Sequence, residues 1–402
     1  MKKKIGFGSS CVHGPEEYRT TRPHQLPIYA TSSFVFESIE EGMEVFTGQR
    51  QGHLYSRFGN PTIDAVAEKI ARLESHGMDI DAFGYLTSSG MSAIATLALG
   101  LLRPGDAILT QGNLYGGTAE LFSKVLEPLN IGLVLARLGD KRAVARVLAE
   151  HPSVRMLYFE TPANPTLECI DIAGLCELGR QAGCHVVADN TFATPYLQQP
   201  LKFGTDFVVH STTKYLNGHG NSTAGAIIGK SQALMQEAIF PKLKLLGTNC
   251  NPWDAWLVNN GLKTLEVRME RHCRNARQVA EWLESRPEVE RVNYPGLVSH
   301  PSHTLAKRQM RDFGGMLSFE LKGGLEAGKQ FMNHIKFCSL APTMGDVDTL
   351  ILHPASMSHL NVPREIRLDN GITDGLVRLS VGIESVEDII GDLEQALRIE
   401  KS

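Results

Sequence analysis

The sequence predicts an α/β protein with a mainly parallel sheet covered by helices, followed by a smaller α+β domain. The first observation is an alternation between residues 107 and 211, where short apolar segments are separated by amphipathic helical patterns. Such segments are typical of strands buried on both faces of a parallel sheet. The second observation is that strand-like "GGMLSFEL" and "LVRLSVGIE" occur near the C-terminus with the closing helical pattern "VEDIIGDLEQAL".

The N-terminal residues 1–60 are irregular and rich in Gly, Pro, Ser and Thr, apart from a short helical pattern at 39–46. We interpret them as an extended arm. A helix is expected in "TIDAVAEKIARLES", with Thr62 as its N-cap, because apolar residues recur there at helical spacing. The large domain is then expected over 61–256 and the C-terminal domain over 257–402.

Within the large domain, the alternation predicts the elements in order. Helices are expected at 91–102, 118–129, 140–151 and 171–183, and strands at 107–111, 131–138, 154–160, 185–190 and 206–211. A helical pattern then runs without interruption from 254 to 285. It is interpreted as one long helix that connects the two domains.

Composition narrows the possible functions. Apolar residues make up 42% and charged residues 21% of the 402, and the formal net charge is −4. These values are ordinary for a soluble globular protein and predict neither nucleic acid nor membrane as a partner. The chain starts without a secretory pattern and has no apolar run of membrane-spanning length, so we expect a cytoplasmic protein.

Cysteines and histidines do not form a recognisable metal pattern. The seven cysteines include no C-x-x-C pair, and we interpret Cys169, Cys176, Cys184 and Cys273 as small apolar residues. The segment "HPSH" from His300 to His303 is interpreted as exposed turn residues. No metal site is therefore predicted.

Polar clusters follow three of the expected strands, where ligands of parallel sheets bind. They contain Asn164 in "TPANPT", Asp189 in "DNT", and Ser211, Thr213 and Lys214 in "HSTTK". A lysine beside an acid suits pyridoxal phosphate, because the lysine can form an imine and the acid can pair with the ring nitrogen. The two hydroxyls are then candidates for the phosphate.

Two further segments bear on a phosphate site. Gly90 and Met91 are expected to begin a helix, whose free amides bind anions. The segment "GAIIGKS", residues 225–231, resembles a nucleotide-binding loop but has three residues between its glycines instead of four. We interpret 225–229 as a strand packed beneath the site, and Lys230 as a solvated surface residue.

An ordered set of motifs resembles one enzyme family. The motifs are "YSRFGNPT", "SSGMSAI", "LYGGT", "FETPANPT", "VVADNTFATPYLQQPL", "VVHSTTKYLNGHG" and "LVRLSVGIE". They are similar to the pyridoxal-phosphate enzymes of cysteine and methionine metabolism, among them methionine γ-lyases, cystathionine γ-synthases and lyases, and O-acylhomoserine sulfhydrylases. The resemblance implies the aspartate-aminotransferase-like type I fold with a seven-stranded sheet. It also implies a homotetramer, a dimer of dimers with shared active sites.

The resemblance also implies roles for individual residues. It implies that Lys214 is the Schiff-base lysine, Asp189 the partner of the ring nitrogen, and Tyr115 a ring that stacks on the cofactor and handles a proton. Without the resemblance, Arg378 would be a surface arginine and Tyr115 a loop aromatic. The remaining implied contacts are the phosphate residues Gly90, Met91, Ser211 and Thr213, the neighbouring subunit's phosphate residues Tyr55 and Arg57, and the substrate residues Arg378, Asn164 and Thr343.

Three functional hypotheses remain open from the sequence. The first is γ-elimination from an amino acid of the methionine or homoserine type, the second is γ-replacement, and the third is a non-catalytic binding protein. Pro342 stands where cystathionine enzymes usually carry a glutamate, and the C-terminal region is most similar to methionine γ-lyases, which favours elimination. Gly117 replaces the cysteine of those lyases, and Lys244 replaces an acid of some of them, so an oxygen-linked substrate such as canavanine is a further possibility.

Overall fold

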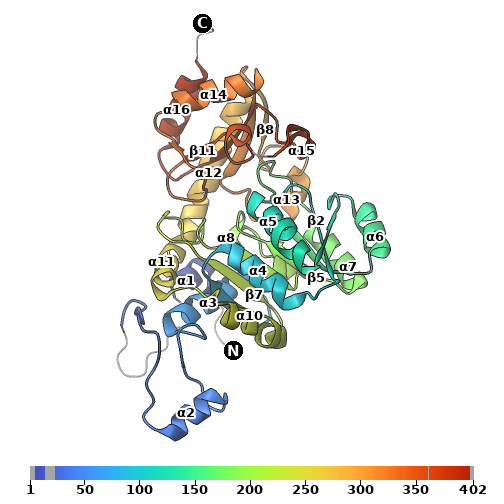
Figure 1. The fold of residues 1–402 in the computed structure, drawn as a ribbon. Coiled ribbons are helices and arrows are strands. Elements are labelled where there is room, and N and C mark those ends of the chain that lie inside the picture. Colours follow the sequence, from blue (N-terminus) through green and yellow to red (C-terminus); the bar gives the residue numbers. More distant parts are fainter. Residues whose placement is uncertain (1–4, 14–22, 361, 399–402) are drawn as a thin grey trace.

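The computed structural model describes residues 5–13, 23–360 and 362–398. Two sheets organise these residues, one of seven strands and one of five. In Figure 1 the seven-stranded sheet occupies the middle of the molecule, and the five-stranded sheet lies above it with the C-terminal helices. The seven-stranded sheet and the α+β unit predicted from the sequence are both confirmed.

The seven-stranded sheet has the order β1-β7-β6-β5-β4-β2-β3. Strand β7 is antiparallel to both of its neighbours, and the remaining neighbouring pairs are parallel. The strands are β1 Phe83–Thr87, β2 Ala107–Thr110, β3 Gly132–Leu135, β4 Val154–Glu160, β5 His185–Asp189, β6 Phe207–Ser211 and β7 Gly225–Gly229. Segment 225–229 is thus a strand, as predicted, and Lys230 beyond it is exposed and paired with Asp206.

Helices cover both faces of this sheet. Successive residues of β4 alternate between them: Met156 and Tyr158 pack in one apolar cluster with α4, and Leu157 and Phe159 pack in another with α6 and α7. The helices are α3 Pro61–Glu74, α4 Gly90–Leu101, α5 Gly116–Glu120, α6 Lys141–Glu150, α7 Ile172–Ala182, α8 Thr194–Leu197, α9 Gln232–Leu234 and α10 Phe240–Leu246. Shorter π and 3₁₀ turns are Leu121–Leu126, Glu127–Leu129, Pro200–Phe203 and Met235–Ile239.

The C-terminal unit consists of the five-stranded sheet and its own helices. Its strand order is β10-β11-β12-β9-β8, so β12 lies in the interior of the sheet. The strands are β8 Val289–Asn293, β9 Met316–Leu321, β10 Ser339–Leu340, β11 Leu350–Leu352 and β12 Leu376–Ser380. The helices are α13 His303–Gln309, α14 Gly324–His334, α15 Arg364–Asp369 and α16 Val386–Leu397, with a 3₁₀ turn at Pro354–Ser356.

The connection between the two sheets corrects one prediction. Instead of one long helix over 254–285, the chain forms α11 Pro252–Leu262 and α12 Leu265–Glu284. Where α11 ends, the carbonyl of Gly261 accepts hydrogen bonds from Arg268 Nη2 at 2.8 Å and from the Thr264 amide at 3.2 Å, which satisfies a carbonyl of the last turn. The predicted domain boundary at 256/257 falls inside α11 and stays a prediction.

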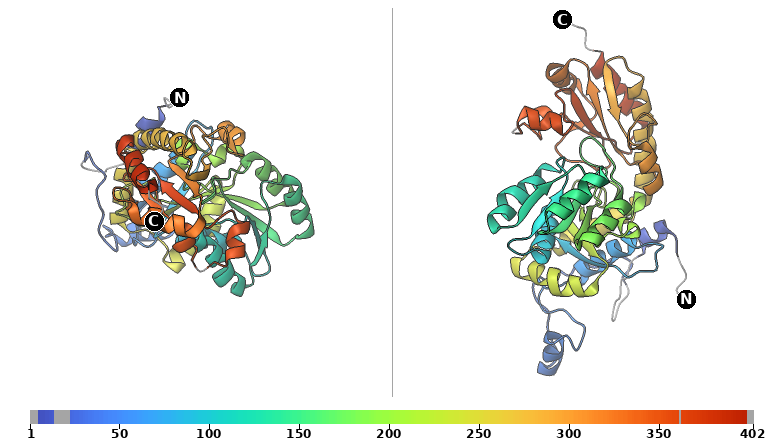
Figure 2. Two further views of the ribbon diagram at one scale, coloured as in Figure 1. Left: turned by 90° about the horizontal axis from the view of Figure 1, so that it is seen from above. Right: turned by 90° about the vertical axis from the view of Figure 1, so that its right-hand side faces the viewer.

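Residues 5–13 and 23–60, the described part of the arm, contain two helices, of which the sequence predicted one. Helix α2, Ile39–Phe46, has the predicted bounds and projects away from the rest of the chain (Figures 1 and 2). Helix α1, Phe7–Val12, was missed, because only Phe7 and Cys11 mark its buried side. It packs against α3 and α12, so residues 7–12 belong to the body of the protein.

Two local predictions are also corrected. The N-cap of α3 is Asn60, whose side chain accepts a hydrogen bond from the Thr62 amide at 3.0 Å. Thr62 lies inside the helix instead, because Pro61 takes the first helical position. His300 is buried and not exposed, and its Nδ1 accepts a hydrogen bond from the Ser302 amide at 3.1 Å.

The cysteine prediction is confirmed, since all seven cysteines are buried and free. Within the described ranges, no group of His, Cys, Asp or Glu side chains has an arrangement that could hold a metal ion. None of the helices there is long and apolar enough to cross a membrane.

Candidate active site

The lysine of "HSTTK" lies in a turn directly after β6. The Lys214 amide donates to the carbonyl of Ser211 at 3.2 Å, which fixes the turn. Its ammonium group, Nζ, donates to Thr343 Oγ1 at 2.8 Å, so a residue of the C-terminal unit meets the end of a strand of the large sheet. Burial and the nearby Arg378 charge lower the pKa of Lys214, and Asp346 opposes this shift. The site therefore favours the neutral, nucleophilic amine.

Arg378 approaches the same threonine from β12. Its Nη2 donates to the Thr343 carbonyl at 2.9 Å, and Nη1 donates to Asn164 Oδ1 at 3.4 Å. Because β12 is an interior strand, Arg378 is only 8% exposed, and burial lowers its pKa to about 10. The surface position that Arg378 would have without the family resemblance is thereby excluded.

Asp189 ends β5, next to β6. Its Oδ1 accepts from the Thr191 amide at 2.9 Å, and Oδ2 accepts from the Tyr158 hydroxyl at 3.1 Å. Thr191 Oγ1 in turn accepts from the Ser211 amide at 2.9 Å. The acid and the hydroxyl-bearing turn are thus held together by one short hydrogen-bonded chain.

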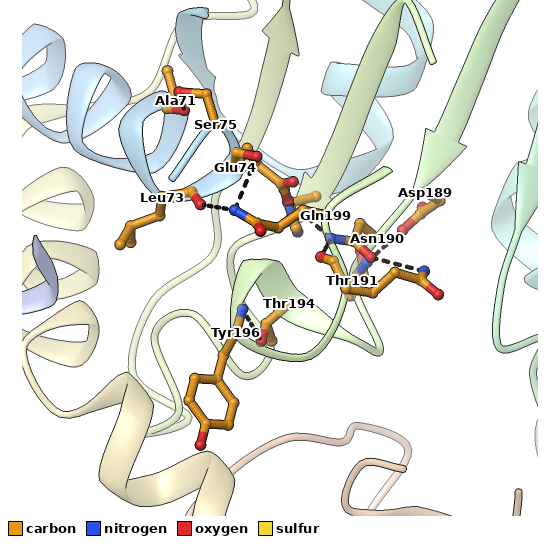
Figure 3. Close-up of polar contacts among 12 residues, drawn as sticks. Ala71, Leu73, Glu74, Ser75, Asp189, Asn190, Thr191, Thr194, Tyr196 and Gln199 are labelled. Atoms are coloured by element: carbon orange, nitrogen blue, oxygen red, sulfur yellow. Dashed lines mark hydrogen bonds and ion pairs between the residues drawn. The ribbon is translucent and has the colours of Figure 1, made fainter. Parts of the chain in front are cut away.

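A buried polar network lies behind these strand ends. Glu74 Oε1 accepts from Asn190 Nδ2 at 2.8 Å and lies 2.6 Å from His210 Nε2. Figure 3 shows Asn190 and Thr191 beside Asp189, with Glu74 and Gln199 at the end of α3. Asn190 follows Asp189 and His210 precedes Ser211, so the network connects the two strand ends to α3.

The start of α4 lies against Ser211. A Cβ atom on Gly90 would lie 2.7 Å from Ser211 Cβ, so only glycine permits this approach. Ser89 caps the helix and accepts from the Ser92 amide, which leaves the first amides of α4, including those of Gly90 and Met91, at the Ser211 side. An anion between them would receive amide and hydroxyl hydrogen bonds.

Thr213 and Tyr115 form no described hydrogen bond with Lys214, Asp189 or Arg378, and each is held by other residues. The Thr213 hydroxyl is engaged with the backbone of Ala224, donating to its carbonyl at 3.2 Å and accepting from its amide at 3.1 Å. Tyr115 occupies the N-cap of α5, and its side chain is 54% exposed. Its amide donates to both carboxylate oxygens of Glu160 at 3.0 Å.

The two arm residues lie apart from this cluster. Arg57 Nη1 donates to the Lys244 carbonyl at 2.5 Å, and its guanidinium group lies 4.8 Å above the Phe58 ring and 5.5 Å above the Tyr55 ring. Tyr55 is 42% exposed. Within the described residues, no hydrogen bond or ion pair joins either of them to Lys214, Asp189 or Arg378.

Several residues of the cluster were missed by sequence reasoning. Glu160 lies in the motif "FETPANPT" and Thr191 in "VVADNTFATPYLQQPL", but neither was assigned a role from the sequence. Their positions were a signal, because Glu160 ends an apolar strand segment and Thr191 follows the polar end of another. Tyr158 lies in the middle of the buried strand β4, so nothing in the local sequence separates it from an ordinary core residue. Asp346 is buried, with its Oδ1 lacking a hydrogen-bond partner among the described residues, and burial raises its pKa.

Comparison with known proteins identifies the family. A model of the Cys/Met metabolism PLP-dependent enzymes matches residues 8–398. The chain belongs to this family. It is 46% identical over 396 residues to an L-methionine gamma-lyase of Fusobacterium nucleatum subsp. polymorphum, with 98% of each chain covered. It is 44% identical over 400 residues to an L-methionine gamma-lyase of Pseudomonas putida, again with 98% of each covered.

Solved structures of the family have the same fold. Cystathionine gamma synthase from Xanthomonas oryzae pv. oryzae, in complex with aminoacrylate and cysteine, superposes with a TM-score of 0.91 at 38% identity, covering 98% of both chains. The predicted type I fold and the predicted enzyme class are confirmed. As a member of the Cys/Met metabolism PLP-dependent enzymes, the protein uses pyridoxal phosphate as its cofactor.

The residues of the cluster fit this cofactor. An aldehyde needs an amine that is neutral near physiological pH, and the lowered pKa of Lys214 favours that form. A phosphate needs fixed donors, which the first amides of α4 and the Ser211 hydroxyl supply. A ring nitrogen that carries a proton needs an acid, and Asp189 at the end of β5 supplies one, with its Oδ2 accepting from the hydroxyl of Tyr158 on the neighbouring β4 at 3.1 Å.

Proposed function

We propose that the protein is a γ-lyase that removes the Cγ leaving group of an L-amino acid of the methionine or homoserine type, giving a 2-oxo acid and ammonia. The observation that carries the proposal is the link through Thr343. Lys214 Nζ donates to its hydroxyl, and Arg378 Nη2 donates to its carbonyl. Thr343 thereby holds the Lys214 amine, which can react with the cofactor, close to the Arg378 guanidinium group, which can bind a carboxylate.

Each residue of the cluster has a part in this proposal. When bound, pyridoxal phosphate holds the substrate amine covalently and accepts the electrons of the bonds that break. Lys214 Nζ takes the α-proton and returns it at a neighbouring carbon. Arg378 binds the substrate α-carboxylate through both of its terminal nitrogens, with Asn164 and Thr343 beside it. Loss of a β-proton then releases the γ substituent, which leaves with a proton, and water converts the remaining carbon skeleton to the 2-oxo acid and ammonia.

The cofactor contacts are assigned in the same way. Asp189 holds the ring-nitrogen proton, and the Tyr115 ring covers the cofactor while its hydroxyl exchanges a proton. The amides of Gly90 and Met91 and the hydroxyls of Ser211 and Thr213 bind the phosphate. Thr213 has to release Ala224 to donate to it.

The arm is proposed to complete the site of a neighbouring subunit. Among the described residues, Tyr55 and Arg57 form no hydrogen bond or ion pair with Lys214, Asp189 or Arg378, as expected for residues that donate phosphate contacts to another copy. Helix α2 exposes Ile39, Met43 and Phe46 at helical spacing, with exposed fractions of 76%, 63% and 69%. Such a stripe is typical of a face that is covered in an assembly, which supports the predicted homotetramer. A cytoplasmic location stays a prediction.

The proposal is tested by a substrate panel. Purified enzyme loaded with pyridoxal phosphate is incubated singly with methionine, homocysteine, cystathionine, canavanine and O-acetylhomoserine, and 2-oxo acid and ammonia are measured. We expect both products from a single amino acid without sulfide. If no single amino acid yields 2-oxo acid and ammonia, while O-acetylhomoserine and sulfide together yield homocysteine and acetate, the γ-lyase proposal is wrong and γ-replacement is correct.

The space beside Gly117 is expected to affect which of these substrates the enzyme prefers. A Cβ atom on Gly117 would lie 2.6 Å from Tyr115 Cε1 and 3.1 Å from Met91 Sδ. The room that a cysteine would occupy is thus partly filled by Tyr115, so a larger leaving group depends on movement of that ring. We expect G117A to change the ratio of kcat/KM values for canavanine and methionine about 5- to 30-fold, because overpacking costs about 1–2 kcal/mol. An unchanged ratio would show that Gly117 does not set this preference.

A further inference from the structure

Glu160 is an acid that neither the proposed reaction nor the phosphate site uses. It is the last residue of β4 and is 7% exposed. Its Cα pairs with that of Asp189 on β5, so the two carboxylates lie side by side at the same sheet edge. In the described part of the chain, no Lys, Arg or His forms an ion pair with Glu160. A buried acid without a cation needs another explanation for its presence.

The contacts of Glu160 lead to the Tyr115 loop. Both carboxylate oxygens accept from the Tyr115 amide at 3.0 Å. The backbone of Glu160 is itself fixed: its amide donates to Gln111 Oε1 and its carbonyl accepts from Gln111 Nε2, each at 3.1 Å. Gln111 directly follows β2, so Glu160 is tied to the ends of two strands. It therefore offers the loop a rigid attachment point.

Tyr115 has one other described backbone hydrogen bond, which its carbonyl accepts from the Ala119 amide at 3.1 Å where α5 begins. Its side chain is half-exposed, and its hydroxyl makes no hydrogen bond to another described residue. Its N-cap position lacks a side-chain cap, and glycines follow at 116 and 117. The backbone at Tyr115 consequently decides where the ring lies.

We propose that Glu160 is a positioning residue that fixes the Tyr115 backbone to the end of β4 and so holds the ring over the cofactor. The inference rests on the proposed role of Tyr115 and concerns cofactor binding, not the identity of the substrate. The raised pKa of Glu160, about 8, fits this role, because burial and the Asp189 charge keep the carboxyl group uncharged at neutral pH beside an ionised neighbour. A neutral carboxyl group still accepts the amide hydrogen bond.

The first test measures the attachment without cofactor or substrate. Hydrogen exchange of the Tyr115 amide is followed by NMR or fragment mass spectrometry in apoprotein, comparing wild type with E160L and E160Q. Leucine suits a buried position but accepts no hydrogen bond, whereas glutamine keeps an acceptor oxygen. We expect about 10-fold faster exchange in E160L and near wild-type exchange in E160Q. A Tyr115 amide that is unprotected in the wild-type protein would overturn the proposal without any variant.

The second test asks whether Glu160 acts through Tyr115. The dissociation constant of pyridoxal phosphate is measured for wild type, E160L, Y115A and the double variant. If Glu160 positions Tyr115, E160L weakens binding about 10-fold in the wild-type background and has almost no effect in the Y115A background. An equal loss in both backgrounds would show that Glu160 merely stabilises the fold, and the proposal would fail. Since no amino-acid substrate is present, a wrong substrate assignment leaves both tests unaffected and appears only in the substrate panel.

Discussion

Lys214 and Arg378 lie where the two sheets meet and are braced by Thr343. Tyr55 and Arg57 lie on the arm instead, where Arg57 donates to the Lys244 carbonyl of α10 and lies over the Tyr55 ring. The first pair has perturbed pKa values because burial removes water from both groups. On the arm, Tyr55 is exposed and Arg57 is half-buried. One half of the proposed site is thus finished within a single chain, and the other half is presented outward.

This difference separates two ways of building a site. Groups whose ionisation is shifted are placed where the two sheets meet, because helices and a second sheet exclude water there. Groups that need only charge and reach are placed on an extended segment, from which we propose that they reach a neighbouring copy. The following predictions test the two halves separately, beginning with the largest expected effect.

Removal of the Lys214 amine is expected to have the largest effect. In K214A, turnover should fall by at least about 10³-fold, because general acid–base catalysis alone contributes about 10²- to 10⁴-fold. Turnover is measured as 2-oxo acid release, and visible absorption of the protein with cofactor should lose the band of the covalent link. K230A, at an exposed lysine after β7, is the matched control and should behave as wild type. Native turnover by K214A would refute the mechanism.

Replacement of the buried guanidinium group should have the next largest effect. R378K keeps the charge but loses the two-pronged geometry, so kcat/KM should fall about 10- to 150-fold, equivalent to about 1.5–3 kcal/mol. The loss should be mainly in KM for the amino acid, with the cofactor absorption spectrum unchanged. R291K, at an exposed arginine of β8, is the control. If R378K changes only cofactor affinity, Arg378 belongs to the cofactor site.

The arm half is tested by mixing two defective chains. R57A lacks a proposed phosphate contact and K214A lacks the amine, so each protein alone should be weakly active or inactive. In a co-expressed mixture, random pairing should restore about a quarter of wild-type activity, because half of the dimers contain one intact shared site out of two. Activity is measured per mole of chain after purification. A mixture no more active than the sum of its components would show that the arm does not serve a neighbour.

The smallest expected effect concerns pH and stability in the body of the protein. Glu160 has a pKa raised from 4.5 to about 8 by burial and by Asp189, with Tyr158 and Tyr115 as its other titratable neighbours. The folded chain holds the Glu160 proton more tightly than the unfolded chain does, and this difference contributes fully to the free energy of unfolding below pH 4.5. The contribution decreases as pH rises toward 8, because in that interval the unfolded chain releases the proton and the folded chain keeps it. Thermal unfolding of apoprotein should therefore show E160Q gaining a few degrees on wild type between pH 5 and 8. A constant difference across that range would contradict the raised pKa.

The sequence determined much of the fold because its signals are local. Apolar runs such as "VRMLYFE" and "DFVVHS" became β4 and β6, since buried parallel strands need continuous apolar side chains. The bounds of α2 and the position of Gly90 at the start of α4 were also predictable, because capping and periodicity lie within a few residues. The family motifs likewise named Lys214, Asp189 and the cofactor.

Other features were decided by contacts between segments far apart in the chain. At the break between α11 and α12, Arg268 donates hydrogen bonds to the carbonyls of Gly261 and of the distant Tyr215. The helical pattern of the sequence continues through this break without interruption. The buried helix α1 depends on α3 and α12, which supply the surface that covers Phe7 and Cys11.

The chemistry of the site was decided in the same way. Periodicity does not show that Thr343 joins Lys214 to Arg378, or that Glu160 holds Tyr115, because each bond joins different elements. The sequence by itself thus determined which groups the protein carries and on which strand ends. Only the tertiary structure decided their ionisation and mutual positions, because burial and long-range hydrogen bonds arise when the two sheets pack together.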